Sequence, residues 1–183
     1  MDEEGILKVI EGDTWMMEVL RAARSVNLPD WMIGAGFVRN KIWDYLHGYE
    51  RREVPTSDID LIYYDPNNLE EAKEKEIDGI LKWKLNANWS TKNQARMHGN
   101  HNKREPYKNS FEALSEWVET PTCVAVKLEG DGKLTLLAPH GIDDLVNLIV
   151  RPTPAFKDKL ETFWGRVNGK EWQKKWPRLK IVV

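Results

Sequence analysis

Residues 31–65 constrain the fold of this chain more than any other part of its sequence. Their apolar start, Trp31-Met32-Ile33, predicts a short buried strand. The turn Gly34-Ala35-Gly36 comes next, and a helix is expected from about Phe37 to His47, where Gly48 ends it. Glycines let the backbone approach a ligand closely, and the free amides at a helix start favour an anion. We therefore predict an anion-binding turn between this strand and this helix.

Two aspartates, Asp58 and Asp60, stand two positions apart in the next apolar run. Side chains alternate between the faces of a strand, so both carboxylates are expected on one face, and Ile59 and Leu61 on the other. Two like charges so placed repel each other unless solvent or a hard cation lies between them. Mg²⁺ prefers a few carboxylates together with phosphate oxygens. The pair therefore predicts a magnesium site with Asp58 and Asp60 as its ligands.

A positive side chain, Arg39, falls in the first turn of the expected helix. A cation there is unfavourable for the helix dipole, so its presence fits a role in contacting an anion. A surface salt bridge explains the same residue equally well. The sequence leaves both interpretations open.

The strand, the Gly-x-Gly turn, Val38-Arg39-Asn40 and Asp58-Ile59-Asp60 together resemble the polymerase-β nucleotidyltransferase superfamily. They are similar in particular to the front end of the tRNA CCA-adding enzymes, where a glycine pair, a Val-Arg-Asp helix and an Asp-x-Asp strand follow in this order. Asn40 stands here in place of that family's aspartate. The segments TKNQARMH (91–98) and LLAPHGIDDLVNLIVRP (136–152) also resemble a bacterial group of small nucleotidyltransferase-like proteins.

The resemblance implies Mg²⁺-dependent transfer of a nucleoside monophosphate from an NTP to an acceptor hydroxyl, with release of pyrophosphate. Asp58 and Asp60 would be the catalytic carboxylates, while Gly34, Ala35, Gly36 and Arg39 would bind the nucleotide. In the superfamily a third carboxylate often joins the pair from a later strand, where this chain offers only Asn93. The alternative is a catalytically inactive nucleotide-binding regulator or scaffold of the same fold. The acceptor stays open among small molecules, proteins and RNA.

A second polar cluster lies at Lys92, Asn93, Gln94, Arg96 and His98. We expect Lys92, Asn93 and Arg96 to contact the phosphate, ribose or base of the nucleotide. A polar edge strand that enters a loop would have the same composition, so a structural role is the alternative.

A Rossmann dinucleotide site is a third possibility, because Gly34-x-Gly36 is followed about 22 positions later by an acidic residue, Asp58. Arg39 stands where that motif needs a third glycine or alanine, and Asp60 has no role in it. Regular βαβ repeats do not follow either. The sequence therefore disfavours this interpretation.

Length and composition indicate one soluble domain of 183 residues, 31% charged and 41% hydrophobic, with a formal net charge of −2. That charge argues against a general polyanion binder, so nucleic-acid binding is possible but not favoured. Basic and aromatic residues gather in a helical carboxyl-terminal segment from about residue 153. The acidic amino terminus and the lack of a long apolar run predict a cytoplasmic protein without a membrane partner.

The pattern of the remaining chain predicts an α+β fold, with a small mixed sheet covered by helices. The lone cysteine, Cys123, is expected to be a buried structural thiol, and the four histidines do not have zinc-site spacing. The expected elements are two helical segments up to about Val26 with Asp13 as a cap, a helix over 69–84, a strand over 89–94, a loop over 99–106, a helix over 110–118, a hairpin of 122–128 with 133–138, and a helix from Gly141 to about Ile149.

Overall fold

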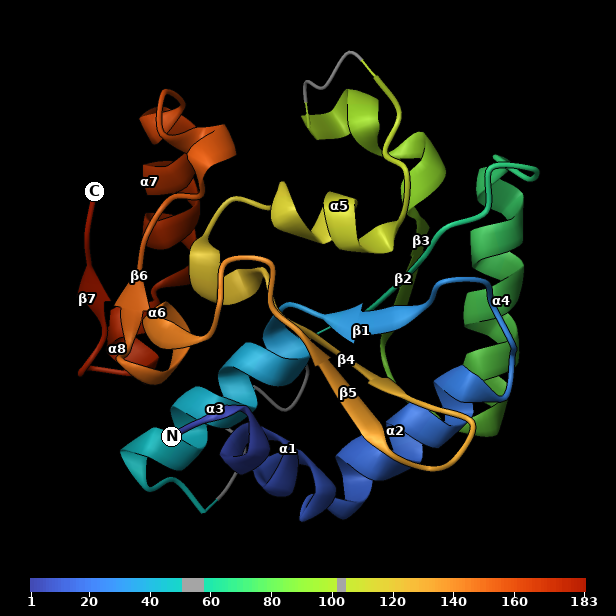
Figure 1. Cartoon of the computed structure of the whole chain (residues 1–183), viewed down its shortest axis with the longest axis horizontal. Coiled ribbons are helices and arrows are strands. Elements are labelled where there is room, and N and C mark those ends of the chain that lie inside the picture. The colour runs from blue at the N-terminus through green and yellow to red at the C-terminus, as the bar shows by residue number, and fades with distance from the viewer. Residues whose placement is uncertain (51–57, 102–104) are drawn as a thin grey trace.

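A five-stranded mixed sheet forms the centre of the computed structural model, which describes residues 1–50, 58–101 and 105–183 (Figure 1). The strand order is β3-β2-β1-β4-β5. Strands β2 and β3 are parallel, and the other neighbouring pairs are antiparallel. The bounds are β1 (Met32–Gly34), β2 (Ile59–Tyr63), β3 (Trp89–Asn93), β4 (Ala125–Leu128) and β5 (Leu134–Leu137). The predicted α+β fold with a small mixed sheet is confirmed.

The antiparallel pairing of β1 with β2 excludes the dinucleotide-binding alternative. A Rossmann site needs a strand, a crossover helix and a parallel strand. Here helix α3 (Gly36–His47) connects two antiparallel strands, in which Met32 pairs with Ile62 and Ile33 with Leu61.

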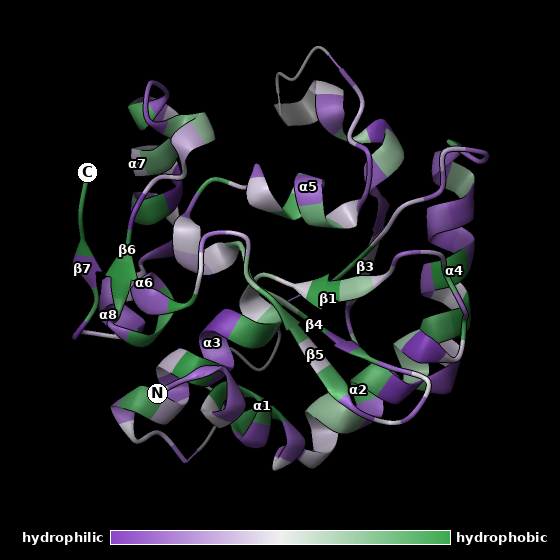
Figure 2. Cartoon of the chain, viewed as in Figure 1, coloured by the Kyte–Doolittle hydropathy of each residue, from purple (hydrophilic) through white to green (hydrophobic). Residues whose placement is uncertain are grey.

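Helices cover one face of the sheet and build the main core. These are α1 (Glu3–Glu11), α2 (Thr14–Arg24), α3 and α4 (Glu71–Lys84). Alternate strand residues such as Ile33, Leu61 and Val126 point into this core, whereas Met32, Ile62 and Ala125 pack on the other face against Leu114 of α5 (Ser110–Ser115). Figure 2 shows hydrophobic residues along β1, β4 and β5 and a mixture of hydrophilic and hydrophobic residues along the surrounding helices.

Local signals set the ends of several helices as expected. The Asp13 carboxylate accepts a hydrogen bond from the amide of Met16, so the predicted cap of α2 is confirmed. Gly48 ends α3 in the left-handed conformation, with φ of 72°. The hairpin of β4 and β5 is also confirmed, with Val126 opposite Leu136. Helix α5 is shorter than expected and ends at Ser115.

Helix α4 lies along β3, the edge strand of the sheet (Figure 1). The carboxylates of Asp78 and Glu74 accept hydrogen bonds from the amides of Thr91 and Asn93, both at the outer edge of β3. An uncovered edge would leave these amides free to pair with another chain. Two acidic side chains of α4 therefore accept the hydrogen bonds of the outward-facing amides on this edge of the sheet.

The carboxyl-terminal part contains less helix than the sequence predicted. The expected helix from Gly141 to Ile149 is wrong beyond α6 (Asp143–Val146), because Leu148 is left-handed and Ile149 begins strand β6 (Ile149–Val150). Strand β6 pairs in parallel with β7 (Lys180–Ile181). This pairing joins residues that are far apart in sequence, so local periodicity could not predict that a strand replaces the end of the helix. Between them lie α7 (Leu160–Lys170) and α8 (Trp172–Lys175).

Four 3-10 helices complete the described elements, at Gln94–Arg96, His98–His101, Thr120–Thr122 and Pro154–Phe156. The expected loop over 99–106 thus begins inside a 3-10 turn, and its residues 102–104 lie outside the described residues. Among the helices of the described chain, none is long and apolar enough to cross a membrane.

A tryptophan cluster attaches the carboxyl-terminal helices to α3. The ring of Trp43 lies 5.7 Å from that of Trp172 and 5.1 Å from that of Trp176, both edge to face. All three rings are buried. The end of the chain is therefore packed against α3, the helix that follows the turn after β1.

Candidate functional site

A pocket of about 540 Å³ opens where the sheet, α3 and the carboxyl-terminal helices meet. Three parts of the chain line it. The first is the turn, α3 and the start of β2, with Ala35, Gly36, Arg39, Asn40, Asp58 and Asp60. The second follows α5, with Glu116, Trp117, Val118 and Thr122. The third, which we call the carboxyl-terminal side, consists of Phe156, Arg166, Lys170, Trp172, Lys175 and Trp176.

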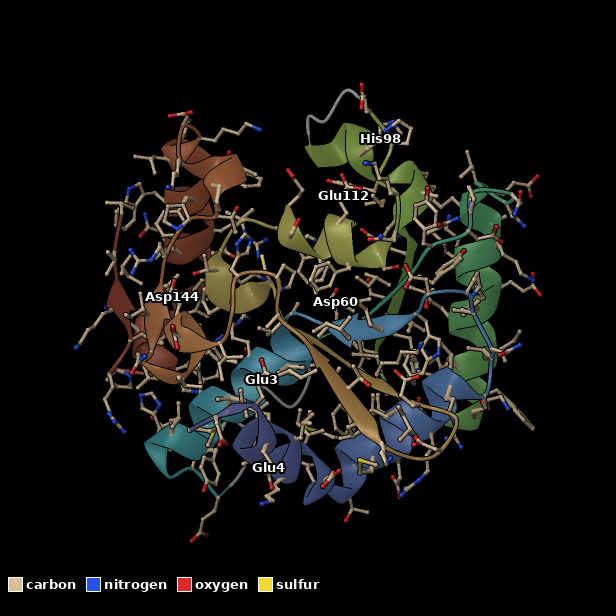
Figure 3. The ribbon with its side chains drawn as sticks, in the orientation of Figure 1. Glu3, Glu4, Asp60, His98, Glu112 and Asp144 are labelled. Atoms are coloured by element: carbon tan, nitrogen blue, oxygen red, sulfur yellow. The ribbon has the colours of Figure 1, made fainter. Side chains whose placement is uncertain are left out.

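The two aspartates enter the pocket from the start of β2. Asp58 is exposed, and the side-chain amide of Asn88 donates a hydrogen bond to its Oδ1. Burial, and then the negative charge of Asp58, raises the pKa of Asp60 to about 6, although the charges of Arg39, Lys170 and Arg166 oppose this rise. Figure 3 places Asp60 near the centre of the molecule, well apart from His98 and Asp144. The pair thus concentrates negative charge in the pocket, and a cation would relieve it.

The turn that precedes α3 is strained at Ala35. This residue has φ of 53° and ψ of −126°, a conformation that residues with a side chain rarely adopt. It occupies the cap position of α3 without a side-chain hydrogen bond, so no side chain of the cap covers the first amides of the helix. A Cβ at Gly36 would lie 3.1 Å from Nδ2 of Asn40, so the turn fits closely against α3. Backbone strain of this kind often marks a ligand site.

Arg39 is buried beneath the pocket, with 6% of its surface exposed. Its Nη1 donates to Oγ1 of Thr122 at 2.6 Å, and its Nε and Nη2 donate to Oδ1 of Asn40 at 3.2 and 3.0 Å. The guanidinium also lies 4.5 Å from the ring centroid of Trp172. Burial lowers the pKa of Arg39 to about 10, so the group stays charged at neutral pH.

The interpretation of Arg39 as a surface salt-bridge residue is wrong. The side chain is buried, and it forms no ion pair with any residue that the structure describes. Arg39 does line the pocket, and its contact with an anion stays a prediction. Sequence alone could not show that Thr122 and Trp172 surround it.

A second arginine is fixed by a buried acid. Glu119 is completely buried, and its Oε1 and Oε2 accept hydrogen bonds from Nε and Nη2 of Arg166 at 2.6 and 3.4 Å. Because an unpaired buried carboxylate is costly, this pair holds the Arg166 side chain in one place. This role of Glu119 could not be predicted from the sequence, because 47 positions separate it from Arg166.

The other predicted nucleotide-binding residues lie elsewhere. Arg96 and Lys92 bind the buried carboxylate of Glu74, with 2.6 Å between Nη2 of Arg96 and Oε2. The side chain of Asn93 bonds to the backbone of Asp65, Asn68 and Ala95. None of the three belongs to the described lining of the pocket, and a nucleotide contact for them stays a prediction. Asn93 is also not placed beside the aspartate pair.

Gly34, predicted to bind the nucleotide, is not among the described residues that line the pocket. A Cβ at this position would lie 3.0 Å from Cη2 of Trp117. The missing side chain makes room for this indole ring, which itself lines the pocket. Ala35, Gly36, Arg39, Asp58 and Asp60 are the predicted site residues that the pocket brings together.

Residues on the two other sides of the pocket were not predicted as a site. Glu116, Trp117 and Thr122 carried no motif, and Arg166, Lys170 and Lys175 stood out only as part of a basic and aromatic segment. Within the described residues, no group of three or more His, Cys, Asp or Glu could hold a metal ion. The two aspartate carboxylates are still oxygen donors of the kind that Mg²⁺ binds together with phosphate oxygens.

Two comparisons with known proteins match most of this chain. A family model described as nucleotidyltransferase matches residues 21–181. A solution structure, described as revealing a CCA-adding enzyme head domain, has a TM-score of 0.87 and 31% identity over 99% of this chain and 96% of the other.

A complex of a CCA-adding enzyme with CTP has a TM-score of 0.57 and 16% identity. The similarity covers all of the present chain but only 44% of the enzyme, and at this low identity it shows the fold alone. A search of curated proteins finds no match.

Proposed function

This chain belongs to the nucleotidyltransferase family, and we propose that it moves a nucleoside monophosphate from an NTP to an acceptor hydroxyl, releasing pyrophosphate. The observation that carries the proposal is the placement of Asp58 and Asp60 in one pocket with the strained turn at Ala35-Gly36. An acidic pair next to an anion-binding turn suits a metal-bound triphosphate. The polymerase-β-like fold agrees with this chemistry.

Asp58 and Asp60 are the residues that would hold Mg²⁺. Their carboxylates share one pocket, and burial and the charge of Asp58 raise the pKa of Asp60 more than Arg39, Lys170 and Arg166 lower it, which supports a cation between the two. Bound Mg²⁺ would neutralise charge on the phosphates and lower the pKa of the acceptor hydroxyl. Asn88 restrains one oxygen of Asp58 and so orients that carboxylate.

The remaining groups of the pocket position the reactants. The uncapped amides at the start of α3 face the phosphates, and the charge of Arg39 lies beneath them. The acceptor hydroxyl gives up its proton to solvent and its oxygen attacks the α-phosphorus, while the bond between the α-phosphorus and the leaving pyrophosphate breaks. No side-chain nucleophile is needed, because alignment and charge neutralisation carry most of such a transfer.

The test is incorporation of label from α-labelled ATP, GTP, CTP and UTP into small-molecule, protein and RNA fractions, with Mg²⁺ and with a chelator. We expect one nucleotide to label one fraction in a Mg²⁺-dependent way. D58N and D60N should abolish labelling and keep a cooperative unfolding transition. D158N is the matched control, because Asp158 is exposed and outside the described pocket lining, and it should remain active.

Two results would contradict the proposal. One is an active, Mg²⁺-dependent D60N protein. The other is tight NTP binding by the wild type without labelling of any fraction or release of pyrophosphate. The second result would support the alternative function, a nucleotide-binding regulator or scaffold of the same fold.

A further inference from the structure

Resting on the proposed function, we propose that Lys170 and Lys175 form the subsite for the β- and γ-phosphates of the nucleotide. The carboxyl-terminal side of the pocket would thus hold the leaving pyrophosphate, while Asp58 and Asp60 hold the metal on another side. Arg39 then acts as a positioning residue that supports Trp172 between the two lysines.

The charge distribution of the chain supports this assignment. Residues 151–183 contain nine lysines and arginines and three acidic residues, although the whole chain has a formal net charge of −2. The fold places this basic segment on one side of the pocket that holds the aspartate pair. Arg166, Lys170 and Lys175 line the same pocket as Asp58 and Asp60, so the basic side and the acidic pair border one cavity.

The positively charged side chains of the pocket differ in whether they already form hydrogen bonds or ion pairs with other protein groups. Arg39 donates to Asn40 and Thr122 and is buried, while Arg166 is paired with Glu119. Lys170 and Lys175 are exposed, and their amines form no ion pair or hydrogen bond with any residue in the described part of the chain. These two ammonium groups are therefore the ones that can turn to a phosphate at no cost in existing pairs.

Trp172 anchors the chain between the two lysines. This tryptophan is 3% exposed, and its ring lies against the guanidinium of Arg39 at 4.5 Å and against Trp43. Lys170 ends α7 and Lys175 ends α8, with Trp172 between them in the chain. The rigid Trp172 therefore fixes where both lysine stems leave the backbone. Flexible lysine side chains on a fixed backbone can bind the phosphates and then release them as pyrophosphate.

The experiment measures binding of magnesium tripolyphosphate, pyrophosphate and orthophosphate to the full chain by titration calorimetry. Tripolyphosphate carries the phosphates without base or ribose, so the result does not depend on which nucleotide is used. We expect K170A/K175A to bind tripolyphosphate roughly tenfold or more weakly than wild type, with a smaller loss for orthophosphate. K157A/K174A is the matched control, because both lysines belong to the same basic segment but lie outside the described pocket lining. It should bind like wild type.

Equal affinity of wild type and K170A/K175A for tripolyphosphate would overturn the subsite. An equal loss of tripolyphosphate affinity in K157A/K174A would also overturn it, because that result indicates nonspecific electrostatic attraction by the basic segment. Both results leave the proposed function standing if D60N still abolishes labelling. Conversely, weakened tripolyphosphate binding in K170A/K175A, combined with a fully active D60N, would support the subsite and contradict the proposed chemistry. R39K serves as a further variant. We expect R39K to weaken tripolyphosphate binding less than K170A/K175A does, because Arg39 affects the phosphates only by positioning Trp172.

Discussion

Trp176 donates its indole N–H to the buried carboxylate of Asp44 at 2.8 Å, although 132 positions separate the two residues. Asp44 lies on α3, the helix that begins at the strained turn, and Trp176 lies directly after α8. This hydrogen bond joins the two sides of the pocket that we assign to the nucleotide. The end of the chain is consequently part of the site.

The first prediction concerns this hydrogen bond. W176F removes the indole N–H and part of a completely buried side chain, and it leaves Asp44 with one donor fewer. We expect a loss of about 2–4 kcal/mol in the free energy of unfolding, measured with urea. W83F is the control, because Trp83 is 86% exposed and its replacement should change stability by less than about 0.5 kcal/mol. Equal stability of both variants would contradict the role of Trp176.

Two glycine replacements should have opposite effects on stability. G34A places a Cβ 3.0 Å from Cη2 of Trp117, so the indole must shift, and we expect a loss of about 1–3 kcal/mol. G79A lies within α4, where no atom comes within 4 Å of the new Cβ, and should gain about 0.5–1 kcal/mol from helix propensity. Thermal unfolding without nucleotide measures both. A G34A protein of unchanged stability but weakened NTP binding would show that Gly34 faces the nucleotide instead.

Sequence reasoning predicted the parts of the site that local patterns determine. The period of two along a strand placed Asp58 and Asp60 together, and the glycine turn marked the start of α3. The hairpin and the cap at Asp13 also rest on residues that are neighbours in sequence. Each of these features can be derived without knowing what lies across the fold.

The missed features all depend on contacts between distant segments. Lys92, Asn93 and Arg96 look like a polar binding cluster until α4 is placed along β3, where Glu74 takes two of them as partners. In the same way, the basic carboxyl-terminal segment becomes a side of the pocket only because Trp172 and Trp176 pack against Trp43. Local periodicity contains no information about either contact.

The third prediction separates this structural cluster from the pocket. Glu74 is 1% exposed, and burial opposes its charge, yet the hydrogen bonds from Arg96 and the Asn93 amide hold its pKa below the usual value. E74Q should therefore lose about 2–4 kcal/mol at pH 7. A lowered pKa stabilises the fold above the unfolded value of 4.5, so the difference from wild type should shrink as the pH falls below it. Calorimetric NTP affinity should not change, and a large loss of affinity would place this cluster in the site.

The fourth prediction concerns Asp60 in the absence of metal. Burial and the charge of Asp58 raise the pKa of this carboxyl group from its ordinary 3.8 to about 6, so the folded chain holds the carboxyl proton more tightly than the unfolded chain. The ionised form of Asp60 is thus destabilising, and the contribution of Asp60 to the free energy of unfolding declines as the pH rises from about 4 to 6. In a chelator at pH 7.5, we expect D60N to be more stable than wild type by about 1–3 kcal/mol. That advantage should become small at pH 4.

Addition of Mg²⁺ should reverse the order of the two proteins. Ligand binding stabilises the folded state that it selects, so the thermal midpoint of wild type should rise with Mg²⁺ at pH 7.5, while that of D60N stays unchanged. D158N, whose exposed carboxylate lies outside the described pocket lining, should follow wild type at every pH. D60N could instead be less stable than wild type in the chelator at pH 7.5. The ionised Asp60 carboxylate would then not destabilise the metal-free fold, and the argument for Asp60 as a metal ligand would fail.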